Sequence, residues 1–326
     1  MTRPAAEVFG FLLVPRFSMM AFVSALEPLR VANRLAQDTL YRWEIISRDG
    51  AAVVASNELS ILADRAMGAP ARYDRLVVVA SFAPETACDR ATASWLRRLD
   101  RDGVALGSID TGSFVLAAAG LLDGHRATTH WESLDGFAEQ FPRVDVGSGL
   151  FIIDRTRFTC AGGTAALDMM LHLIRLRHGH PLAASASEQF IHAKIRDPQE
   201  RQRMDAEQRD GISRPALAQA IALMETHLEE VLGIGQICTT AGISRRNLER
   251  LFQVHFRLSP QRYYLDLRLQ RARAMLRYSD LPVVEISVAC GFGAAAHFSR
   301  AYRAWAGHPP SADRRGLVRG ITPHLR

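Results

Sequence analysis

The residues with the clearest chemical potential lie at a turn between an apolar run and a helix. Residues 104–106 are apolar, Gly107-Ser-Ile-Asp-Thr-Gly112 follows them, and residues 114–120 are small or apolar. A strand, a sharp turn and a helix in this order lift the side chain of the turn residue above a sheet edge, with backbone N–H groups beside it. That residue is Asp110. Aspartate attacks carbon in some enzymes, but no Ser or Cys stands at this tip.

Other polar and aromatic side chains are candidates to join Asp110. His130 follows it by 20 residues, and Glu27 stands beside Pro28 in an expected helix. A proline after the first turn would kink or restart that helix and turn Glu27 toward the end of the sheet. The candidate ligand-binding residues are Asp110, Thr111, Glu27, His130, Trp131, Phe82 and Phe17.

Asp110 is open to three interpretations. It could cap the helix of residues 111–114 by accepting backbone N–H groups. It could instead join Glu27 in holding a small cation against the aromatic ring of Trp131, Phe82 or Phe17, although Trp131 could equally be a core residue. The third interpretation is an amidase or hydrolase that uses Asp110 with His130. Asp168 and His172, spaced by four residues, are expected to form only a pair on a helix surface.

Composition and length favour an ordinary globular protein of about two domains. The 326 residues are 48% hydrophobic and 23% charged. No apolar run approaches the ~18 residues that span a bilayer, and no signal peptide is evident, so we expect a cytoplasmic protein without membrane contact. The four cysteines show no metal-ligand or disulfide spacing, and we expect neither a metal nor a cofactor.

Strands alternate with helices over residues 7–195. Continuous apolar runs mark buried strands at 8–14, 76–80 and 104–109, and residues 150–160 are expected to form a hairpin. This alternation predicts an α/β domain with a doubly wound, mostly parallel, flavodoxin-like sheet and ligands at the carboxyl ends of the strands. Residues 196–214 are charged, poor in large apolar side chains, and are expected to be a linker.

The positive charge is concentrated at the C-terminal end. Residues 212–326 hold 16 Arg against 8 acidic residues, a net charge of +8, whereas the preceding part carries −2. A basic domain attached to a nearly neutral body is typical of proteins that bind nucleic acid, although a membrane surface or an acidic partner would also attract it.

An internal near-repeat organises this basic part, which we place at residues 215–317, with a basic tail at 318–326. Residues 234–252 can be laid on 283–302, and each copy has the pattern of a helix, a glycine turn and a second helix. The pattern predicts an all-α domain with two helix-turn-helix units that bind double-stranded DNA.

The exposed residues of the second helix in each copy are the candidate DNA contacts. They are Ser244, Arg245, Arg246, Asn247 and Arg250 in the first copy, and Ala294, Ala295, Ala296, His297 and Arg300 in the second. Ser244 is expected to cap its helix. Alanine offers only methyl contacts to bases, so we expect the first unit to carry most of the hydrogen-bonded readout.

Both parts resemble known families. Residues 216–317 closely resemble the AraC-type DNA-binding domain, whose pattern is matched by Cys290-Gly-Phe, His297-Phe-Ser-Arg300, Gly307 and Pro310. Residues 7–192 resemble the PfpI-like branch of the class I glutamine amidotransferase fold, through Asp-Thr-Gly-x-Phe-x-Leu-Ala at the elbow, Gly-Leu-Leu-Asp-Gly and Thr-Thr-His-Trp. In that branch the elbow residue is normally cysteine. The aspartate here excludes cysteine-type catalysis.

The fusion of these two domains resembles a family of transcriptional regulators, and especially its members that respond to glycine betaine or carnitine. The supporting stretches are Leu26-Glu-Pro-Leu-Arg-Val-Ala-Asn33, Thr129-His-Trp-Glu132 and Cys160-Ala-Gly-Gly-Thr164. The resemblance implies a non-enzymatic homodimer that binds a small cationic inducer, activates transcription and contacts RNA polymerase. Arginine or another cationic nitrogen compound would satisfy the same chemistry.

Overall fold

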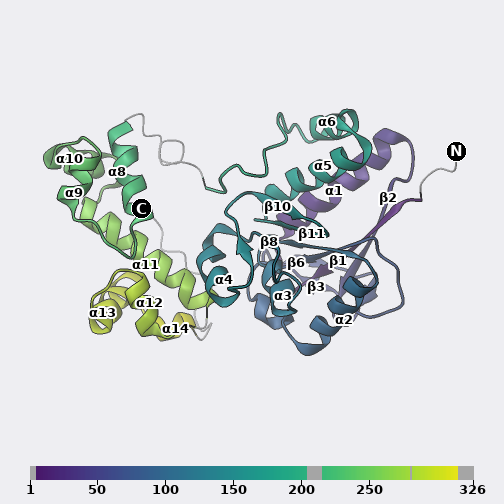
Figure 1. Ribbon diagram of the computed structural model, residues 1–326, viewed down its shortest axis with the longest axis horizontal. Helices are drawn as coiled ribbons and strands as arrows, with labels where there is room; N and C mark the ends of the chain where they lie inside the picture. Colours follow the sequence, from purple (N-terminus) through teal and green to yellow (C-terminus); the bar gives the residue numbers. More distant parts are fainter. Residues whose placement is uncertain (1–4, 204–214, 280, 315–326) are drawn as a thin grey trace. The chain divides into compact units, whose positions relative to one another are not determined.

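The computed structural model describes residues 5–203, 215–279 and 281–314. The chain divides into two compact units, Met1–Gln202 and Arg203–Arg326. Residues 204–214 of the expected linker and the whole of the expected tail at 318–326 lie outside the described residues. Figure 1 shows an α/β arrangement in the first unit and helices alone in the second.

A seven-stranded sheet forms the centre of the first unit, in the order β10-β11-β7-β6-β1-β2-β5. The strands are β1 (Glu7–Leu13), β2 (Tyr41–Ser47), β5 (Arg65–Ala66), β6 (Arg75–Val79), β7 (Ala105–Ile109), β10 (Phe151–Asp154) and β11 (Arg157–Cys160). Every neighbouring pair is parallel except β10 and β11, which form the predicted hairpin. The predicted mostly parallel sheet is confirmed.

Helices cover both faces of this sheet (Figure 1). One layer consists of α1 (Met19–Ala36), α5 (Ala165–His178) and α6 (His180–Gln189), and the other contains α2 (Arg90–Arg101) and α3 (Gly112–Ala118). Alternate β1 residues, including Phe9 and Phe11, point toward the first layer and pack in one core with Phe22 of α1 and Met170 of α5. Burial on both faces explains why the central strands are continuously apolar.

Helix α1 runs unbroken through Pro28, contrary to the expected kink or restart. Ser18 caps its start by accepting a hydrogen bond from the N–H of Ala21 at 3.3 Å, and Pro28 lies on its buried side. The shorter elements of the unit are β3 (Val53–Val54), β4 (Ser60–Ile61), β8 (Arg126–Ala127), β9 (Asp145–Val146), α4 (Leu134–Gln140) and two 3-10 turns, Pro84–Ala87 and Trp131–Ser133.

The described part of the second unit is helical, as predicted. Its helices are α8 (Pro215–Thr226), α9 (Ile234–Thr240), α10 (Arg245–Phe256), α11 (Pro260–Tyr278), α12 (Val283–Ala289), α13 (Ala295–Ala306) and α14 (Pro310–Arg314). Two helix-turn-helix pairs, α9–α10 and α12–α13, have their own cores around Phe252 and Phe298. The turns contain Gly242 and Gly291 with φ of 63° and 74°, a left-handed conformation that favours glycine.

Helix α11 joins the two pairs. Its first half contributes Tyr264 to the first core, and its second half contributes Met275 to the second. Among the described residues, no helix combines the length and apolarity that crossing a membrane requires.

Candidate ligand site and nucleic-acid interface

The expected elbow is present between β7 and α3. Asp110 has φ of 59°, a left-handed conformation that non-glycine residues seldom adopt. Its N–H donates to the carbonyl of Cys160 at 3.0 Å, which ties the turn to β11. A Cβ on Gly112 would lie 2.2 Å from the carbonyl oxygen of Val78, so glycine is needed for α3 to start this close to β6. Backbone strain of this kind is typical of functional sites.

The Asp110 side chain is nearly enclosed, at 7% exposure. Burial raises the pKa of its carboxyl to about 6, against the opposing effects of His130, a hydrogen bond from the Ser81 side chain and the N–H of Thr111, while Glu132 adds to the rise. The N-cap position of α3 belongs to Thr111. Asp110 therefore receives one N–H of the turn without being the cap residue, and its carboxylate lacks a full countercharge.

His130 and Trp131 lie next to each other at the entrance to the 3-10 turn. The Nδ1 of His130 accepts a hydrogen bond from the N–H of Glu132 at 3.4 Å, and the two rings are 5.4 Å apart between centroids. Trp131 is 39% exposed and is not the core residue that its size allowed. Of this segment, His130 and Glu132 are close enough to Asp110 to act on its pKa, and the Trp131 ring packs beside His130.

Thr111 of the elbow is linked to the segment that contains Phe82. The Thr111 hydroxyl donates to the carbonyl of Ser81 at 2.7 Å, which links the elbow to the residue before Phe82. The Phe82 ring is 42% exposed, and the guanidinium carbon of Arg16 lies 5.2 Å from its centroid. Arg16 therefore already occupies one side of the ring.

Two expected members of the site lie elsewhere. The Glu27 carboxylate accepts three hydrogen bonds of 2.6 to 3.0 Å from Arg30, one turn along α1, so it does not converge on Asp110 as expected. Phe17 is 0% exposed and packs edge-on against Phe22 in the core, so it is not a ligand wall. The continuous helix α1 explains the first difference, because it keeps Glu27 beside its i+3 neighbour.

Sequence reasoning missed two polar residues around Asp110. Ser81 follows the end of β6, next to β7 in the sheet, and Glu132 follows the His-Trp pair. Ligands bind at the carboxyl ends of adjacent parallel strands, and Ser81 follows the carboxyl end of β6, so this rule could have identified it. No comparable signal singled out Glu132 as a group that acts on Asp110.

Asp168 is not the surface residue that its spacing to His172 suggested. It is 0% exposed, and it accepts hydrogen bonds from His192 Nε2 at 2.8 Å and from the N–H of Arg196 at 2.7 Å. His172 is instead 2.9 Å from the guanidinium of Arg175. The sequence interval of 28 residues between Asp168 and Arg196 concealed this pair.

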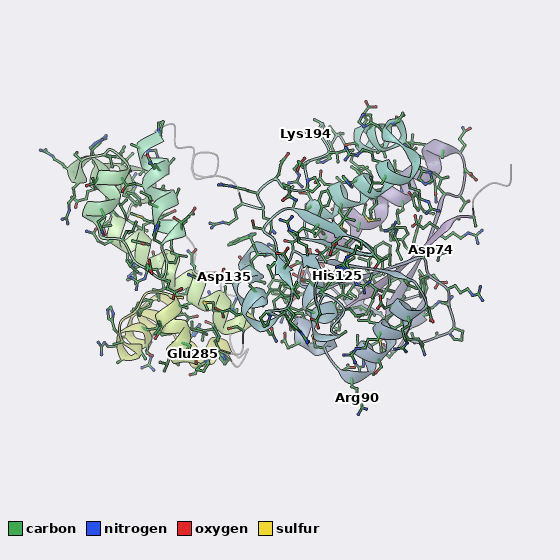
Figure 2. The ribbon with its side chains drawn as sticks, viewed as in Figure 1. Asp74, Arg90, His125, Asp135, Lys194 and Glu285 are labelled. Carbon is green, nitrogen blue, oxygen red and sulfur yellow. The ribbon has the colours of Figure 1, made fainter. Side chains whose placement is uncertain are left out.

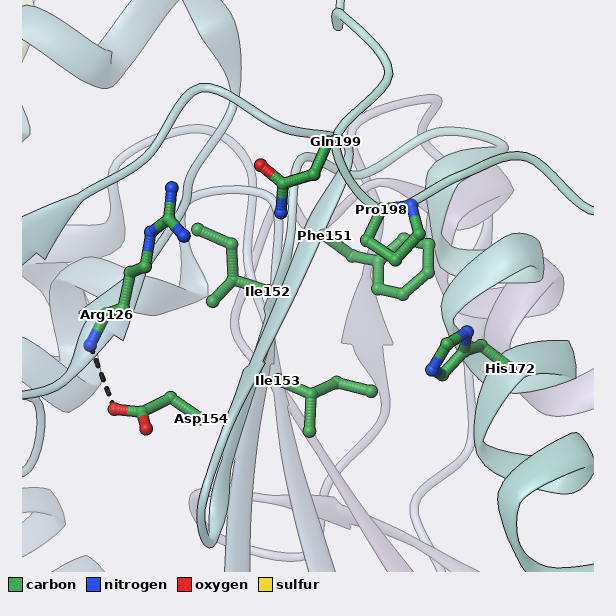
Figure 3. Close-up of a pocket in the computed structure, with 8 residues that line it drawn as sticks. All are labelled: Arg126, Phe151, Ile152, Ile153, Asp154, His172, Pro198 and Gln199. Atoms are coloured by element: carbon green, nitrogen blue, oxygen red, sulfur yellow. Dashed lines mark hydrogen bonds between the residues drawn. The ribbon is translucent and has the colours of Figure 1, made fainter.

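One cavity of about 300 Å³ lies away from the elbow, beside the edge strand β10. Figure 3 shows its wall, where Arg126 donates its N–H to Asp154 at 3.0 Å. The lining residues are Arg126, Phe151, Ile152, Ile153, Asp154, His172, Pro198 and Gln199. Over the described ranges, no group of three or more His, Cys, Asp or Glu side chains is arranged to hold a metal ion.

The predicted DNA contacts of the first repeat lie on α10. Ser244 caps this helix by accepting from the N–H of Asn247 at 3.3 Å, which confirms its expected capping role. Arg245, Arg246 and Arg250 are exposed. Arg245 donates to the Glu249 carboxylate at 3.0 Å and Arg250 to the side-chain Oδ1 of Asn247 at 3.0 Å, so both guanidinium groups are orientated along the helix.

Helix α13 presents the second set. Ala294 is its N-cap residue and makes no side-chain cap bond, while Ala296, His297 and Arg300 are exposed and Ala295 is half-buried. The His297 ring stands 5.8 Å from Phe292, edge to face, which fixes it at the start of the helix. The two second helices thus expose different chemistry, guanidinium and amide groups on one and mostly methyl groups on the other.

Both units match families of known proteins. Residues 12–176 match the DJ-1/PfpI family, and residues 237–316 match a helix-turn-helix domain. The HTH-type transcriptional regulator CdhR of Pseudomonas aeruginosa is 51% identical over 309 residues, which cover 95% of this chain and 92% of that protein. The chain belongs to the AraC-type transcriptional regulators with a DJ-1/PfpI domain.

Two further relatives support this membership. The HTH-type transcriptional regulator GbdR of Pseudomonas aeruginosa is 43% identical over 314 residues, covering 96% of this chain and 86% of that protein. A crystal structure of an AraC family transcriptional regulator from Pseudomonas putida matches 56% of this chain and 99% of its own, with a TM-score of 0.51 and 28% identity. These relatives are transcriptional regulators and not enzymes, so the amidase or hydrolase alternative is not supported. The protein is a DNA-binding transcriptional regulator.

Proposed function

We propose that this AraC-type regulator senses a small cationic metabolite, such as glycine betaine or carnitine, at the Asp110 elbow. The observation that carries the proposal is the buried Asp110 carboxylate, whose pKa is raised to about 6 and which stands where this fold otherwise presents a thiolate. A permanently charged ammonium group would supply a positive charge next to the buried Asp110 carboxylate.

The surroundings of Asp110 suit an onium ion. Trp131 offers an exposed indole face, and quaternary ammonium groups bind to such faces through cation–π attraction. Glu132 adds negative potential, since it is among the groups that act on Asp110. The carboxylate of a betaine would meet the His130 imidazole or the N–H groups of the elbow. A ligand with both charges therefore fits better than a simple cation.

We infer that ligand binding in the first unit alters how the second unit meets DNA, in a homodimer that activates transcription through RNA polymerase. Each chain has two recognition helices, α10 and α13, and helix-turn-helix proteins place such helices in the major groove. A dimer doubles this set and reads two half-sites, so a change in the geometry of either chain changes operator affinity.

Thermal denaturation of the full chain with glycine betaine, carnitine, choline and arginine tests the ligand class. We expect at least one compound to raise the melting temperature, since a ligand at 100 times its Kd stabilises the native state by about 2.7 kcal/mol. Asp110→Asn should abolish the rise, and Trp131→Ala should reduce it. The matched control is Asp145→Asn, a carboxylate whose side chain is 75% exposed, which should behave as wild type. A panel without any effect would overturn the cationic ligand.

A further inference from the structure

Residues 192–202 form a strap along the first unit, between α6 and the start of the second unit. The N–H of Leu150 donates to the carbonyl of Glu200 at 3.2 Å, and Gly149 forms an antiparallel bridge with Arg201. A Cβ on Gly149 would lie 2.4 Å from the carbonyl oxygen of Pro198, so the strap can approach only a glycine here. Part of the segment expected to be a free linker is therefore bonded to the sheet domain.

The first anchor of the strap is the buried carboxylate of Asp168 on α5. Besides the N–H of Arg196 and the ring of His192, it accepts a hydrogen bond from Arg196 Nε at 2.8 Å. The other end of the same guanidinium donates to the Thr164 hydroxyl at 2.6 Å. A buried carboxylate is stable only when such donors surround it, so release of Arg196 is costly.

The second anchor is Gln202, at the end of the strap. Its Nε2 is 3.0 Å from Thr128 Oγ1, 3.0 Å from the Thr129 carbonyl and 2.9 Å from the Gly149 carbonyl. Both threonines are 0% exposed. The amide thus holds the last residue of the first unit against a buried segment.

Both anchors lead to Asp110. The Thr129 hydroxyl donates to the Asp110 carbonyl at 3.0 Å, so one residue bonds to the elbow through its side chain and to Gln202 through its backbone. On the other side, a Cβ on Gly162 would lie 2.8 Å from Asp110 Cβ, and Gly162 begins the turn into α5. The elbow is therefore in contact with the segments that hold both ends of the strap.

The strap is held at its anchors without being fully packed. Gln202 Oε1 is buried and has no hydrogen-bond partner among the described residues. Pro198 and Gln199 cover the cavity of about 300 Å³ beside β10 (Figure 3). On the outer side, Lys194, labelled in Figure 2, makes only a surface ion pair with Glu200 at 2.7 Å, which contributes little. Ile195 packs on the apolar clusters of the first unit, and the other strap contacts named here are polar. A segment held mainly by polar contacts opens more readily than the core beneath it.

We propose that the strap is a clasp controlled by the elbow, and that Gln202 is the positioning residue that couples the state of Asp110 to the chain entering the DNA-binding unit. The proposal rests on the proposed function for the ligand, but the coupling itself is a property of this network. Occupation of the elbow changes the Thr129 bond, and with it the closure of the clasp. Coupling of this kind requires an element with two arrangements whose balance the site shifts.

Amide hydrogen exchange in the full chain tests the clasp without a ligand. The reporters are the amides of Arg196 and Leu150, which the closed strap protects. In Gln202→Leu we expect exchange at both to rise roughly fivefold, the effect of losing one net hydrogen bond. Gln199→Leu, a change to an exposed glutamine on the same strap, should leave both rates at the wild-type value.

The decisive measurement is amide exchange after Asp110→Asn is introduced into the wild type and, separately, into Gln202→Leu. We expect this change at the elbow to alter the exchange of both reporters in the wild type, and to have no further effect in Gln202→Leu. A purely structural role for Gln202 would not remove the response to Asp110. An equal response in both backgrounds, or no response in the wild type, overturns the clasp.

Operator affinity with and without glycine betaine then separates the clasp from the ligand proposal. We expect glycine betaine to raise the melting temperature of Gln202→Leu as it does for the wild type, while its effect on operator Kd disappears. An unchanged effect on Kd contradicts the coupling role of Gln202. If glycine betaine binds neither protein while the exchange response to Asp110→Asn depends on Gln202, the ligand is wrong and the clasp is supported.

Discussion

At the scale of single residues, Asp110 combines a left-handed backbone, 7% exposure and a raised pKa. Burial disfavours its charged form, and the nearby donors Ser81 and Thr111 offset this only in part. A carboxylate in this state gains more from a cationic partner than an exposed one would. The elbow geometry, which in α/β hydrolases presents a nucleophile, here presents a carboxylate.

The pKa of Asp110 predicts a specific dependence of stability on pH. Since the pKa rises from 3.8 to about 6 on folding, the contribution of this group to stability is fully present below the unfolded value and is lost as the pH rises through about 6. Above pH 7, Asp110→Asn should be more stable than the wild type by up to roughly 3 kcal/mol, and this gap should close toward pH 4. Urea denaturation between pH 4 and 8 measures it. A gap that does not vary with pH would contradict the assignment.

Arg246 is the residue of α10 for which we expect direct base readout. It is exposed and lies in the first turn, where recognition helices contact base edges. Arg246→Ala should weaken operator binding by about 1–3 kcal/mol and relax preference at one base pair. Arg257→Ala, at the other end of α10, should preserve the preference. If Arg246→Ala leaves sequence preference intact while Ala295→Arg abolishes it, the second unit and not the first dominates readout.

At the scale of elements, the two recognition helices differ at their N-cap residue, Ser244 before α10 and Ala294 before α13. Ser244 gives α10 a side-chain acceptor for an otherwise unpaired N–H, whereas Ala294 leaves α13 without one although its backbone is extended, as a cap requires. The two copies of the motif in this chain therefore differ in helix capping.

This asymmetry predicts opposite effects of two substitutions. Ser244→Ala should lower the free energy of unfolding by about 1 kcal/mol, and Ala294→Ser should raise it by a similar amount. Equilibrium denaturation of the full chain, followed by far-UV circular dichroism, measures both. Ala296→Ser, inside the same helix, is the control and should bring no gain, since serine is a weaker helix former than alanine. A gain as large as that of Ala294→Ser would show that capping is not the cause.

At the scale of the whole molecule, the charge is divided between the two units. The first 211 residues carry −2 and the remainder +8, so the attraction to DNA resides in the second unit, while the carboxylate proposed to sense the ligand, Asp110, is buried in the first. Exposed charges are screened by salt and buried ones far less.

Salt should therefore act on the two binding reactions differently. Operator affinity should fall with added salt, with a slope of log K against log salt concentration of about −0.9 for each phosphate contact. Affinity for an onium ligand at Asp110 should change much less over the same range. Titrations at ~50 and ~200 mM salt compare them, a range over which six to ten phosphate contacts weaken DNA binding by roughly a thousandfold or more. A ligand affinity as salt-sensitive as DNA binding would place the ligand on the surface.

The sequence by itself determined the features that depend on neighbours a few residues apart. Apolar runs separated by helical patterns predicted the parallel sheet, the glycine turns predicted two helix-turn-helix pairs, and Ser244 was recognisable as a cap because its partner is Asn247. These patterns reflect backbone geometry that local residue types set directly.

Tertiary structure decided which side chains meet. Glu27 was expected at Asp110 but is held by Arg30, Phe17 is in the core, and Asp168 binds a strap 28 residues further along the chain. Such partners follow from burial and strand order, which bring distant segments together at distances that spacing in the sequence does not encode. The desolvation that raises the pKa of Asp110 has the same origin, because only the packed fold removes water from that carboxylate.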